Sequence, residues 1–181
     1  QPGDQILFAR GGTFRGDFTV PNSGTSSAPI TVGAYGTGAD PIISGSNLVT
    51  GWTLYSGSIY KAAVTGSVKH VFVGGARQTL ARYPNTGWMY NDQGSTTTLY
   101  DNALTQATSY WNGATLVVRS SNWSYDARTV SAFNAGTLTC PAMNFNLGAN
   151  NWGYFLCNKL NQLDQAGETR GRVDLSDDPE A

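Results

Sequence analysis

The chain has 181 residues, of which 40% are hydrophobic and only 13% are charged, and its formal net charge is -1. The charged share is about half that of a typical globular protein, which argues against long exposed helices. There is no basic stripe that would bind nucleic acid, and no apolar run nears the roughly 18 residues of a membrane span, so we expect neither partner. The 22 glycines, with many Thr, Ser and Asn residues, predict an all-β protein with frequent turns.

The first part of the chain predicts short strands separated by turns. Apolar runs at 6–9, 29–35 and 41–45 alternate with stretches rich in Gly, Pro, Asn and Ser. Ile6 and Ile30 are 24 residues apart, which is close to one coil of a parallel β-helix. A sandwich would show the same short strands, so both architectures stay open at this point.

A hairpin is predicted next, and the chain then changes in character. Gly74-Gly75 is a hairpin signal between strands predicted at 68–73 and 77–83. The other predicted elements are short helices at 99–104 and 158–163 and strands at 115–119, 128–133 and 137–140. The predicted segments are coils and hairpin at 1–87, an inserted β-unit at 88–145, a return to the coils at 146–168 and a polar tail at 169–181.

Few residues are suited to metal binding or nucleophilic chemistry. Cys140 and Cys157 are the only cysteines, and a disulfide and two buried free thiols are equally compatible with the sequence. His70 is the only histidine, no Gly-x-Ser-x-Gly motif accompanies it, and we expect it to be structural. We therefore predict no cofactor and no zinc site, and leave open a calcium ion held by Asp and backbone carbonyls.

An ordered series of motifs resembles a known group of proteins. The stretches that carry the resemblance are 3–8, 11–16, 28–36, 41–45, 81–85, 151–156 and 163–168. Together they resemble the right-handed parallel β-helix glycoside hydrolases, such as β-xylosidases with an inserted β-domain, from about residue 3 to residue 168. The resemblance implies the N-terminal turns of a right-handed parallel β-helix that carries a small inserted antiparallel β-unit.

Two departures from that group bear on activity. Its members continue for several hundred residues, and the resemblance implies that their catalytic carboxylates lie on later coils. After Glu168 the group would continue with a Trp-Tyr-Tyr run, whereas this chain continues with Thr169-Arg170-Gly171-Arg172. We therefore interpret 169–181 as an unrelated tail, with the gene truncated or frame-shifted.

Glycoside hydrolysis requires two carboxyl groups on either side of the scissile bond. Asp164 and Glu168 are four residues apart, so they would share one face if the segment were helical. The alternative is that Asp164 serves a turn and Glu168 is merely exposed. Asp101 is expected to cap a short helix, and Asp126 to form a surface pair with Arg128.

Aromatic residues crowd between positions 88 and 125 and are the stronger sign of carbohydrate binding. Sugar rings present apolar C–H faces that stack on aromatic rings, while polar side chains bind the hydroxyls. The residues that we predict to bind substrate are Trp88, Tyr90, Asp92, Tyr110, Trp111, Trp123 and Arg82. The alternative is that Trp111 and Trp123 fill the core of the inserted unit.

These observations predict a secreted glycoside hydrolase that acts on plant cell-wall polysaccharide, namely xylan, cellulose or β-glucan, through Asp164 and Glu168. One alternative is a non-catalytic carbohydrate-binding module that uses the aromatic cluster. Another is an inactive fragment whose open β-helix end pairs with a second copy, because an uncapped end exposes backbone groups.

Overall fold

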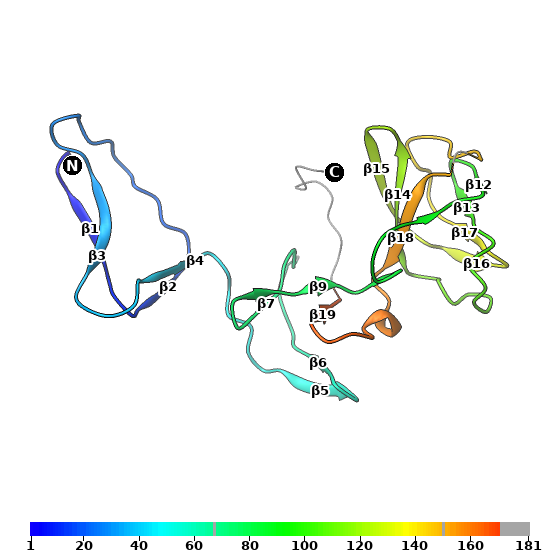
Figure 1. Ribbon diagram of the computed structural model, residues 1–181, viewed down its shortest axis with the longest axis horizontal. Helices are drawn as coiled ribbons and strands as arrows, with labels where there is room; N and C mark the ends of the chain where they lie inside the picture. Colours follow the sequence, from blue (N-terminus) through cyan, green and yellow to red (C-terminus); the bar gives the residue numbers. More distant parts are fainter. Residues whose placement is uncertain (67, 150, 171–181) are drawn as a thin grey trace. The chain divides into compact units, whose positions relative to one another are not determined.

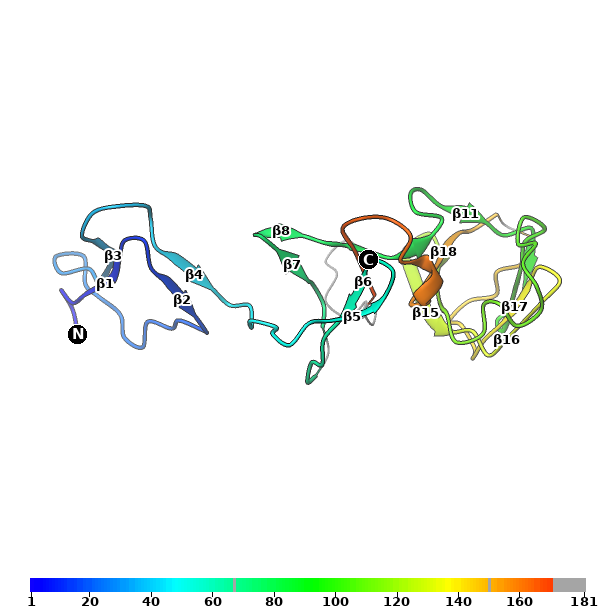
Figure 2. The same cartoon turned by 90° about the horizontal axis from the view of Figure 1, so that it is seen from below.

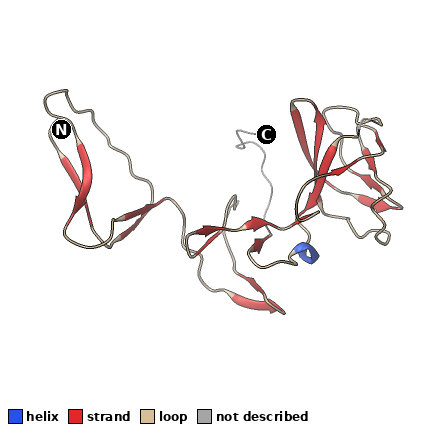
Figure 3. Ribbon diagram, viewed as in Figure 1, coloured by secondary structure: helices blue, strands red, loops and turns tan. Residues whose placement is uncertain are grey.

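The computed structural model describes residues 1–66, 68–149 and 151–170, and over these residues the protein is all-β (Figure 3). Their single helix is a 3-10 turn, η1 (Leu160–Gln162), at the place where the sequence predicts a longer helix. No helix in this part of the chain is long and apolar enough to cross a membrane. The chain folds as two compact units, residues 1–63 and 64–181, and the predicted tail lies outside the described residues from position 171 on.

Parallel strand pairs form most of the first unit. Its strands are β1 (Gln5–Ala9), β2 (Thr13–Arg15), β3 (Thr31–Tyr35), β4 (Ile42–Ser44), β5 (Thr53–Ser56) and β6 (Ile59–Lys61). β1 pairs with β3 and β2 pairs with β4, both in parallel, while β5 and β6 form an antiparallel hairpin (Figure 1). β3 followed by β4 therefore repeats the course of β1 followed by β2. We call β1 with β2 the first coil and β3 with β4 the second coil.

The register of β1 and β3 places Ile6 opposite Val32. The spacing of Ile6 and Ile30, which suggested one coil, therefore differs by two residues from the offset between the paired residues of β1 and β3. Pro29 has no N–H to offer a neighbouring strand, so it cannot join a ladder on that side. Pairing consequently begins at Thr31.

Residues 1–63 bury little of their apolar surface. Phe8 lies against Phe14 and Phe18, with ring centroids 4.9 and 5.4 Å apart. Every residue in this range nevertheless keeps part of its surface exposed, and Val32 and Ile43 on the second coil are each 47% exposed. Two-stranded sheets of this kind do not enclose a hydrophobic core by themselves.

The hairpin predicted at Gly74-Gly75 is present in the second unit. β7 (Phe72–Val73) pairs antiparallel with β8 (Ala76–Arg77), and the two glycines have φ values of 59° and 84°. Positive φ at both central residues is what a type I′ turn requires. The strand predicted from residue 68 begins only at Phe72, so His70 is exposed and lies outside it.

A parallel pair frames the antiparallel part of the second unit. The strands concerned are β9 (Thr79–Leu80), β10 (Arg82–Tyr83), β18 (Gly153–Cys157) and β19 (Glu168–Thr169). β9 and β19 pair in parallel, while β10 and β18 pair antiparallel, with Arg82 opposite Cys157. The chain thus leaves β9, builds an antiparallel domain over 82–157, which we call the sandwich, and returns beside the strand that it left.

Two sheets that face each other make up the sandwich (Figure 2). The larger sheet has the order β10-β18-β14-β15, with β11 also paired to β18, and the smaller has the order β12-β13-β17-β16. The remaining strands are β11 (Met89–Tyr90), β12 (Gln93–Gly94), β13 (Thr98–Tyr100), β14 (Thr115–Ser121), β15 (Ser124–Thr129), β16 (Ala132–Asn134) and β17 (Thr137–Thr139). The segment boundaries expected near 87 and 145 stay predictions.

Apolar side chains from both sheets fill the space between them. The largest fully buried ones in this cluster are Trp111, Tyr154, Phe133, Leu99, Leu104, Leu116, Leu138, Leu147, Leu156, Val118 and Val130. The helix predicted over 99–104 is wrong, because its first two residues belong to β13. Leu99 is fully buried whereas Tyr100 is 37% exposed, which is the two-residue alternation of a strand that pairs on both sides.

Cys140 and Cys157 are buried free thiols, which decides between the two interpretations of their spacing. Burial raises the pKa of both thiols, and raises that of Cys157 to about 12. The thiolate is the reactive form of cysteine. We therefore expect neither thiol to react with a chromogenic disulfide reagent near neutral pH until the sandwich unfolds, and rapid labelling of the native protein would contradict this expectation.

The raised pKa of Cys157 also predicts how stability depends on pH. Above the ordinary pKa of 9.0 the unfolded thiol ionises while the folded thiol keeps its proton, so the folded state binds more protons. Stability should therefore be lost as the pH rises from 9.0 toward about 12. Urea unfolding of the protein and of Cys157→Ser at a series of pH values measures this, and an equal slope for both proteins would count against it.

Candidate functional site

One face of the larger sheet points away from the core of the sandwich. Side chains alternate between the two faces of a strand. Tyr154 and Leu156 on β18 are buried in the core, so Phe155 between them points to the outer face. The register sets Phe155 opposite Val117 on β14, and the same face of β15 carries Tyr125.

Trp88 packs on this outer face. Its ring centroid lies 5.3 Å from that of Phe155, edge to face, and 5.9 Å from that of Tyr125. Trp88 and Tyr90 both approach β18 at Gly153, where an added Cβ would lie 3.5 and 3.6 Å from their rings. Trp88 is 40% exposed and Tyr90 is 52% exposed, so the rings remain open to solvent. We call Trp88, Tyr90, Tyr125 and Phe155 the aromatic platform.

Arg82 holds the platform together from one side. Its guanidinium carbon lies 4.0 Å from the ring centroid of Phe155 and 5.6 Å from that of Trp88. Nε donates to the carbonyl of Pro84 at 2.9 Å, and Nη2 donates to the carbonyl of Gly87. Burial lowers the pKa of Arg82 from its ordinary value. The side chain predicted to touch substrate is thus also fastened to the loop that carries Trp88.

Trp123 stands apart from the platform at the tip of the β14–β15 hairpin. Its side chain is 78% exposed, so it does not fill the core. Arg119 fixes the turn beneath it by donating to the carbonyls of Ser121 at 3.2 Å and Asn122 at 2.7 Å. A large apolar ring on a braced turn is available to a ligand.

Trp111 and Tyr110 belong to the core side of the sandwich. Trp111 is fully buried and its Nε1 donates to Gln106 Oε1 at 3.0 Å, as in the alternative in which it fills the core. Tyr110 is half-buried, and its ring packs edge to face on Trp111 at 4.8 Å. A ring with no exposed surface has no face to offer a sugar, so Trp111 is not part of the platform.

Asp164 lies on a loop that is not helical, and Glu168, close to it, is the first residue of β19. Glu168 Oε2 accepts the main-chain N–H groups of Asp164 and Gln165, both at 2.9 Å. Asp164 is exposed, and its Oδ1 accepts from Asn85 Nδ2 at 3.0 Å. The carboxylate of Glu168 therefore closes the loop before β19, while that of Asp164 ties the same loop to Asn85.

Asp92 and Asp101 lie near the end of the smaller sheet. Asp92 is exposed, and its Oδ2 accepts the N–H of Asn102 at 2.8 Å. Asp101 is buried and caps no helix, because none forms there. Its Oδ1 accepts the N–H of Ala103 at 2.7 Å and its Oδ2 accepts from the Tyr154 hydroxyl at 2.6 Å. Burial, and to a lesser extent the hydrogen bond to Asp101, raises the pKa of Tyr154. The phenol therefore keeps its proton and donates a hydrogen bond to Asp101 between the two sheets.

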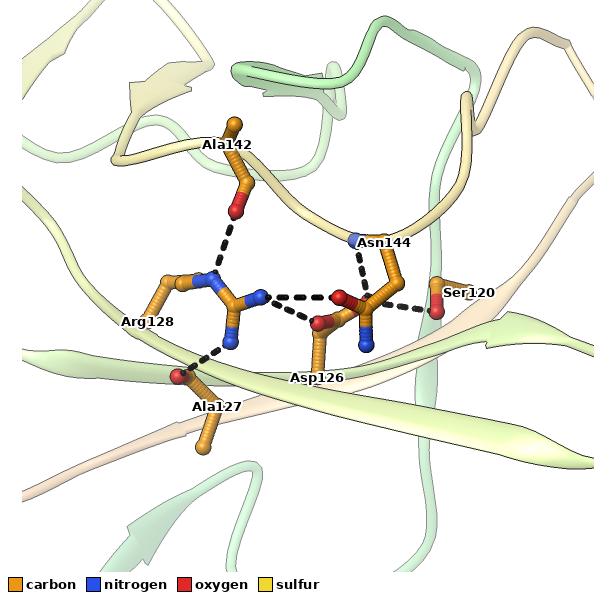
Figure 4. Close-up of polar contacts among 6 residues, drawn as sticks. All are labelled: Ser120, Asp126, Ala127, Arg128, Ala142 and Asn144. Carbon is orange, nitrogen blue, oxygen red and sulfur yellow. Dashed lines mark hydrogen bonds and ion pairs between the residues drawn. The ribbon is translucent and has the colours of Figure 1, made fainter.

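Asp126, expected to form a surface pair with Arg128, is instead buried, while the Arg128 side chain is 25% exposed (Figure 4). The guanidinium of Arg128 lies 2.6 Å from Asp126 Oδ1. Oδ2 accepts from Ser120 Oγ at 2.6 Å and from the N–H of Asn144 at 3.0 Å. Arg128 also donates to the carbonyl of Ala142 at 2.8 Å. The cluster fastens the loop after β17 onto the larger sheet, and the position of that loop is why Asp126 has no exposed surface.

Metal ligands do not gather in the part of the chain that the structure describes: no three His, Cys, Asp or Glu side chains come together there. Two members of the platform, Tyr125 and Phe155, are absent from the predicted set of substrate-binding residues. Their common face depends on the pairing of β14 with β15 and β18, which the sequence does not display. No family model, no curated protein and no solved structure matches this chain.

Proposed function

We propose that this chain binds a neutral plant cell-wall polysaccharide through the aromatic platform. The observation that carries the proposal is the contact of Trp88 with Phe155 and Tyr125 on an outer sheet face, with Trp88 still 40% exposed. Aromatic faces of this kind pack against the C–H faces of sugar rings. A net charge of -1 suits a neutral polymer better than an acidic one.

Rigidity of the platform adds to this argument. Binding is tighter when the contact groups are already held in place, because less conformational freedom is lost. Arg82 fastens the loop that carries Trp88, and antiparallel strands carry Tyr125 and Phe155. Arg119, opposite Tyr125 in the register, supplies a polar group on the same face that can meet sugar hydroxyls.

The proposed setting of the sandwich is a right-handed parallel β-helix related to the β-helical glycoside hydrolases. Three parallel pairs support this proposal, namely β1 with β3, β2 with β4, and β9 with β19. The last pair encloses the sandwich, as an inserted domain requires. A cell-wall polymer is met outside the cell, so we also propose that the protein acts there.

Hydrolysis by Asp164 and Glu168 is the second candidate function. It is favoured by one observation, the closeness of the two residues, since Glu168 Oε2 lies 2.9 Å from the main-chain nitrogen of Asp164. Binding is preferred because the Glu168 carboxylate already accepts two main-chain N–H groups. A general acid or nucleophile must instead face the glycosidic bond.

One assay separates the two functions. The pure protein is mixed with insoluble xylan, cellulose or β-glucan, and bound protein and released reducing sugar are both measured. We expect binding to one of these polymers without sugar release. Release that disappears in Glu168→Gln would overturn the binding-only function, and this variant keeps an amide oxygen that can still accept from the loop. If the protein neither binds a polymer nor releases sugar, both functions are contradicted.

A further inference from the structure

The second coil of the first unit has an open backbone edge. The N–H of Thr31 donates to the carbonyl of Asp4 at 2.9 Å, so Thr31 turns its main-chain groups toward β1. Alternate residues of a strand direct these groups to opposite sides. Val32 and Ala34 therefore direct their N–H and C=O groups away from β1. Over residues 1–66, 68–149 and 151–170, β3 pairs with no strand except β1.

β4 repeats this arrangement. The N–H of Ile42 donates to the carbonyl of Gly12 at 2.9 Å, so Ile43 directs its main-chain groups to the open side. The Ile43 side chain is on the same face as Phe14, with which it is in register, and Phe14 packs on Phe8. Ile43 is 47% exposed. We call Phe8, Phe14 and Ile43 the inner column of the coils. This column is apolar, and its last member, Ile43 on the second coil, is half-exposed.

The first coil presents matching groups. Its inner side chains, Phe8 and Phe14, are apolar. A first coil placed on a second coil therefore brings apolar side chains into contact with apolar side chains. Charges match as well, because Arg10 on the first coil forms an ion pair with Asp40, which lies between β3 and β4 on the second. The side chain of Asp40 is 85% exposed. Asp40 therefore lies between its own Arg10, one coil before it, and the place one coil beyond it, where its exposed carboxylate is open to a second guanidinium from the opposite side.

We propose that a second copy of this chain stacks head to tail on the first, with its β1 pairing to the open edge of β3 and its β2 to that of β4. The Arg10 of the arriving copy then approaches Asp40 from the side opposite to the Arg10 of its own chain. A head-to-tail contact is heterologous, so it repeats rather than closes, and stacks longer than a dimer form as concentration rises. This association is independent of the aromatic platform.

Sedimentation velocity of the full chain over a roughly hundredfold concentration range tests the proposal. We expect the mean mass to rise with concentration. Ile43→Lys should weaken association at least about tenfold, because it puts a charge on the inner column. Ile42→Lys is the matched control: Ile42 is adjacent, is 59% exposed and points to the other face, so its change should stay within about twofold. A monomer throughout, or equal effects of the two variants, would overturn the proposal.

Complementation tests the head-to-tail direction. Leu7 directs its N–H to the open edge of β1, since the carbonyl of Asp4 bonds to β3 and the pattern alternates. Leu7→Pro therefore blocks the first coil and Ile43→Lys blocks the second. At a concentration at which each variant alone is a monomer, an equal mixture should form a dimer and nothing larger. A mixture that stays monomeric, with native far-UV spectra for both variants, contradicts the proposal, and Ala34→Pro replaces Ile43→Lys if the spectrum of Ile43→Lys changes.

Discussion

Replacing Trp88 by alanine should lower the affinity for polysaccharide at least about tenfold, which corresponds to about 1.4 kcal/mol. Trp88 contacts both Phe155 and Tyr125, so its removal takes away the central ring and separates the other two. Large aromatic side chains carry a disproportionate share of the energy in binding sites. Affinity electrophoresis in gels that contain the bound polymer measures the loss.

Trp52→Ala is the matched control for this result. Trp52 is 49% exposed, but it lies in the first unit, and its Nε1 donates to the carbonyl of Val49 at 3.0 Å. Its replacement should leave the affinity within about twofold. Equal losses from the two variants would mean that binding depends on exposed tryptophan in general. An unchanged affinity in Trp88→Ala, with a native near-UV spectrum, would remove the platform from the site.

The largest loss of stability is expected from Asp126→Ala, at about 3 kcal/mol. The change removes the partner of Arg128 and leaves the hydroxyl of Ser120 and the N–H of Asn144 without their acceptor. Removing a buried acceptor is costly because the donors that it leaves behind stay desolvated, whereas the side chain of Arg128 is 25% exposed and keeps its bond to Ala142. Urea unfolding monitored by the fluorescence of the tryptophans, with Trp111 buried in the core, measures the loss.

Asp92→Ala serves as the comparison for Asp126→Ala. Asp92 is an exposed carboxylate that accepts one main-chain N–H, from Asn102 at 2.8 Å. Water can satisfy that group when the carboxylate is removed, so the cost should be about 1 kcal/mol or less. If the two variants lost equal stability, burial of the Asp126 cluster would not be the source of its contribution.

Local signals in the sequence predicted local structure. The Gly74-Gly75 turn was recognisable because glycine adopts positive φ without strain, so two successive glycines favour a type I′ turn. The strand from Thr115 was recognisable as a continuous apolar run, and β14 is among the most buried strands. The all-β class followed from composition and is confirmed.

Features that depend on distant partners could not be predicted in the same way. Leu99 and Leu104 are both buried, but the residues from 99 to 104 do not by themselves distinguish a short helix from a strand followed by a turn. The pairing of β13 with β12 and β17 decides between them. Asp126 looked exposed beside Arg128 because nothing local announces the loop that carries Asn144 over it. Trp88 was identified as a ring that could bind sugar, whereas its partners emerge only from the strand register.

The return of β19 to the side of β9 has a consequence for how such a protein is assembled in evolution. Arg82 and Cys157 lie opposite each other, so the sandwich begins and ends at adjacent points. A domain whose ends meet can be inserted into or removed from a host turn while the flanking parallel pair is retained. Such a domain also shortens the effective loop between β9 and β19 once it has folded, which lowers the entropy cost of joining strands that are far apart in the chain. The sandwich therefore has the topology of a module that can be exchanged while the pairing of β9 with β19 is kept.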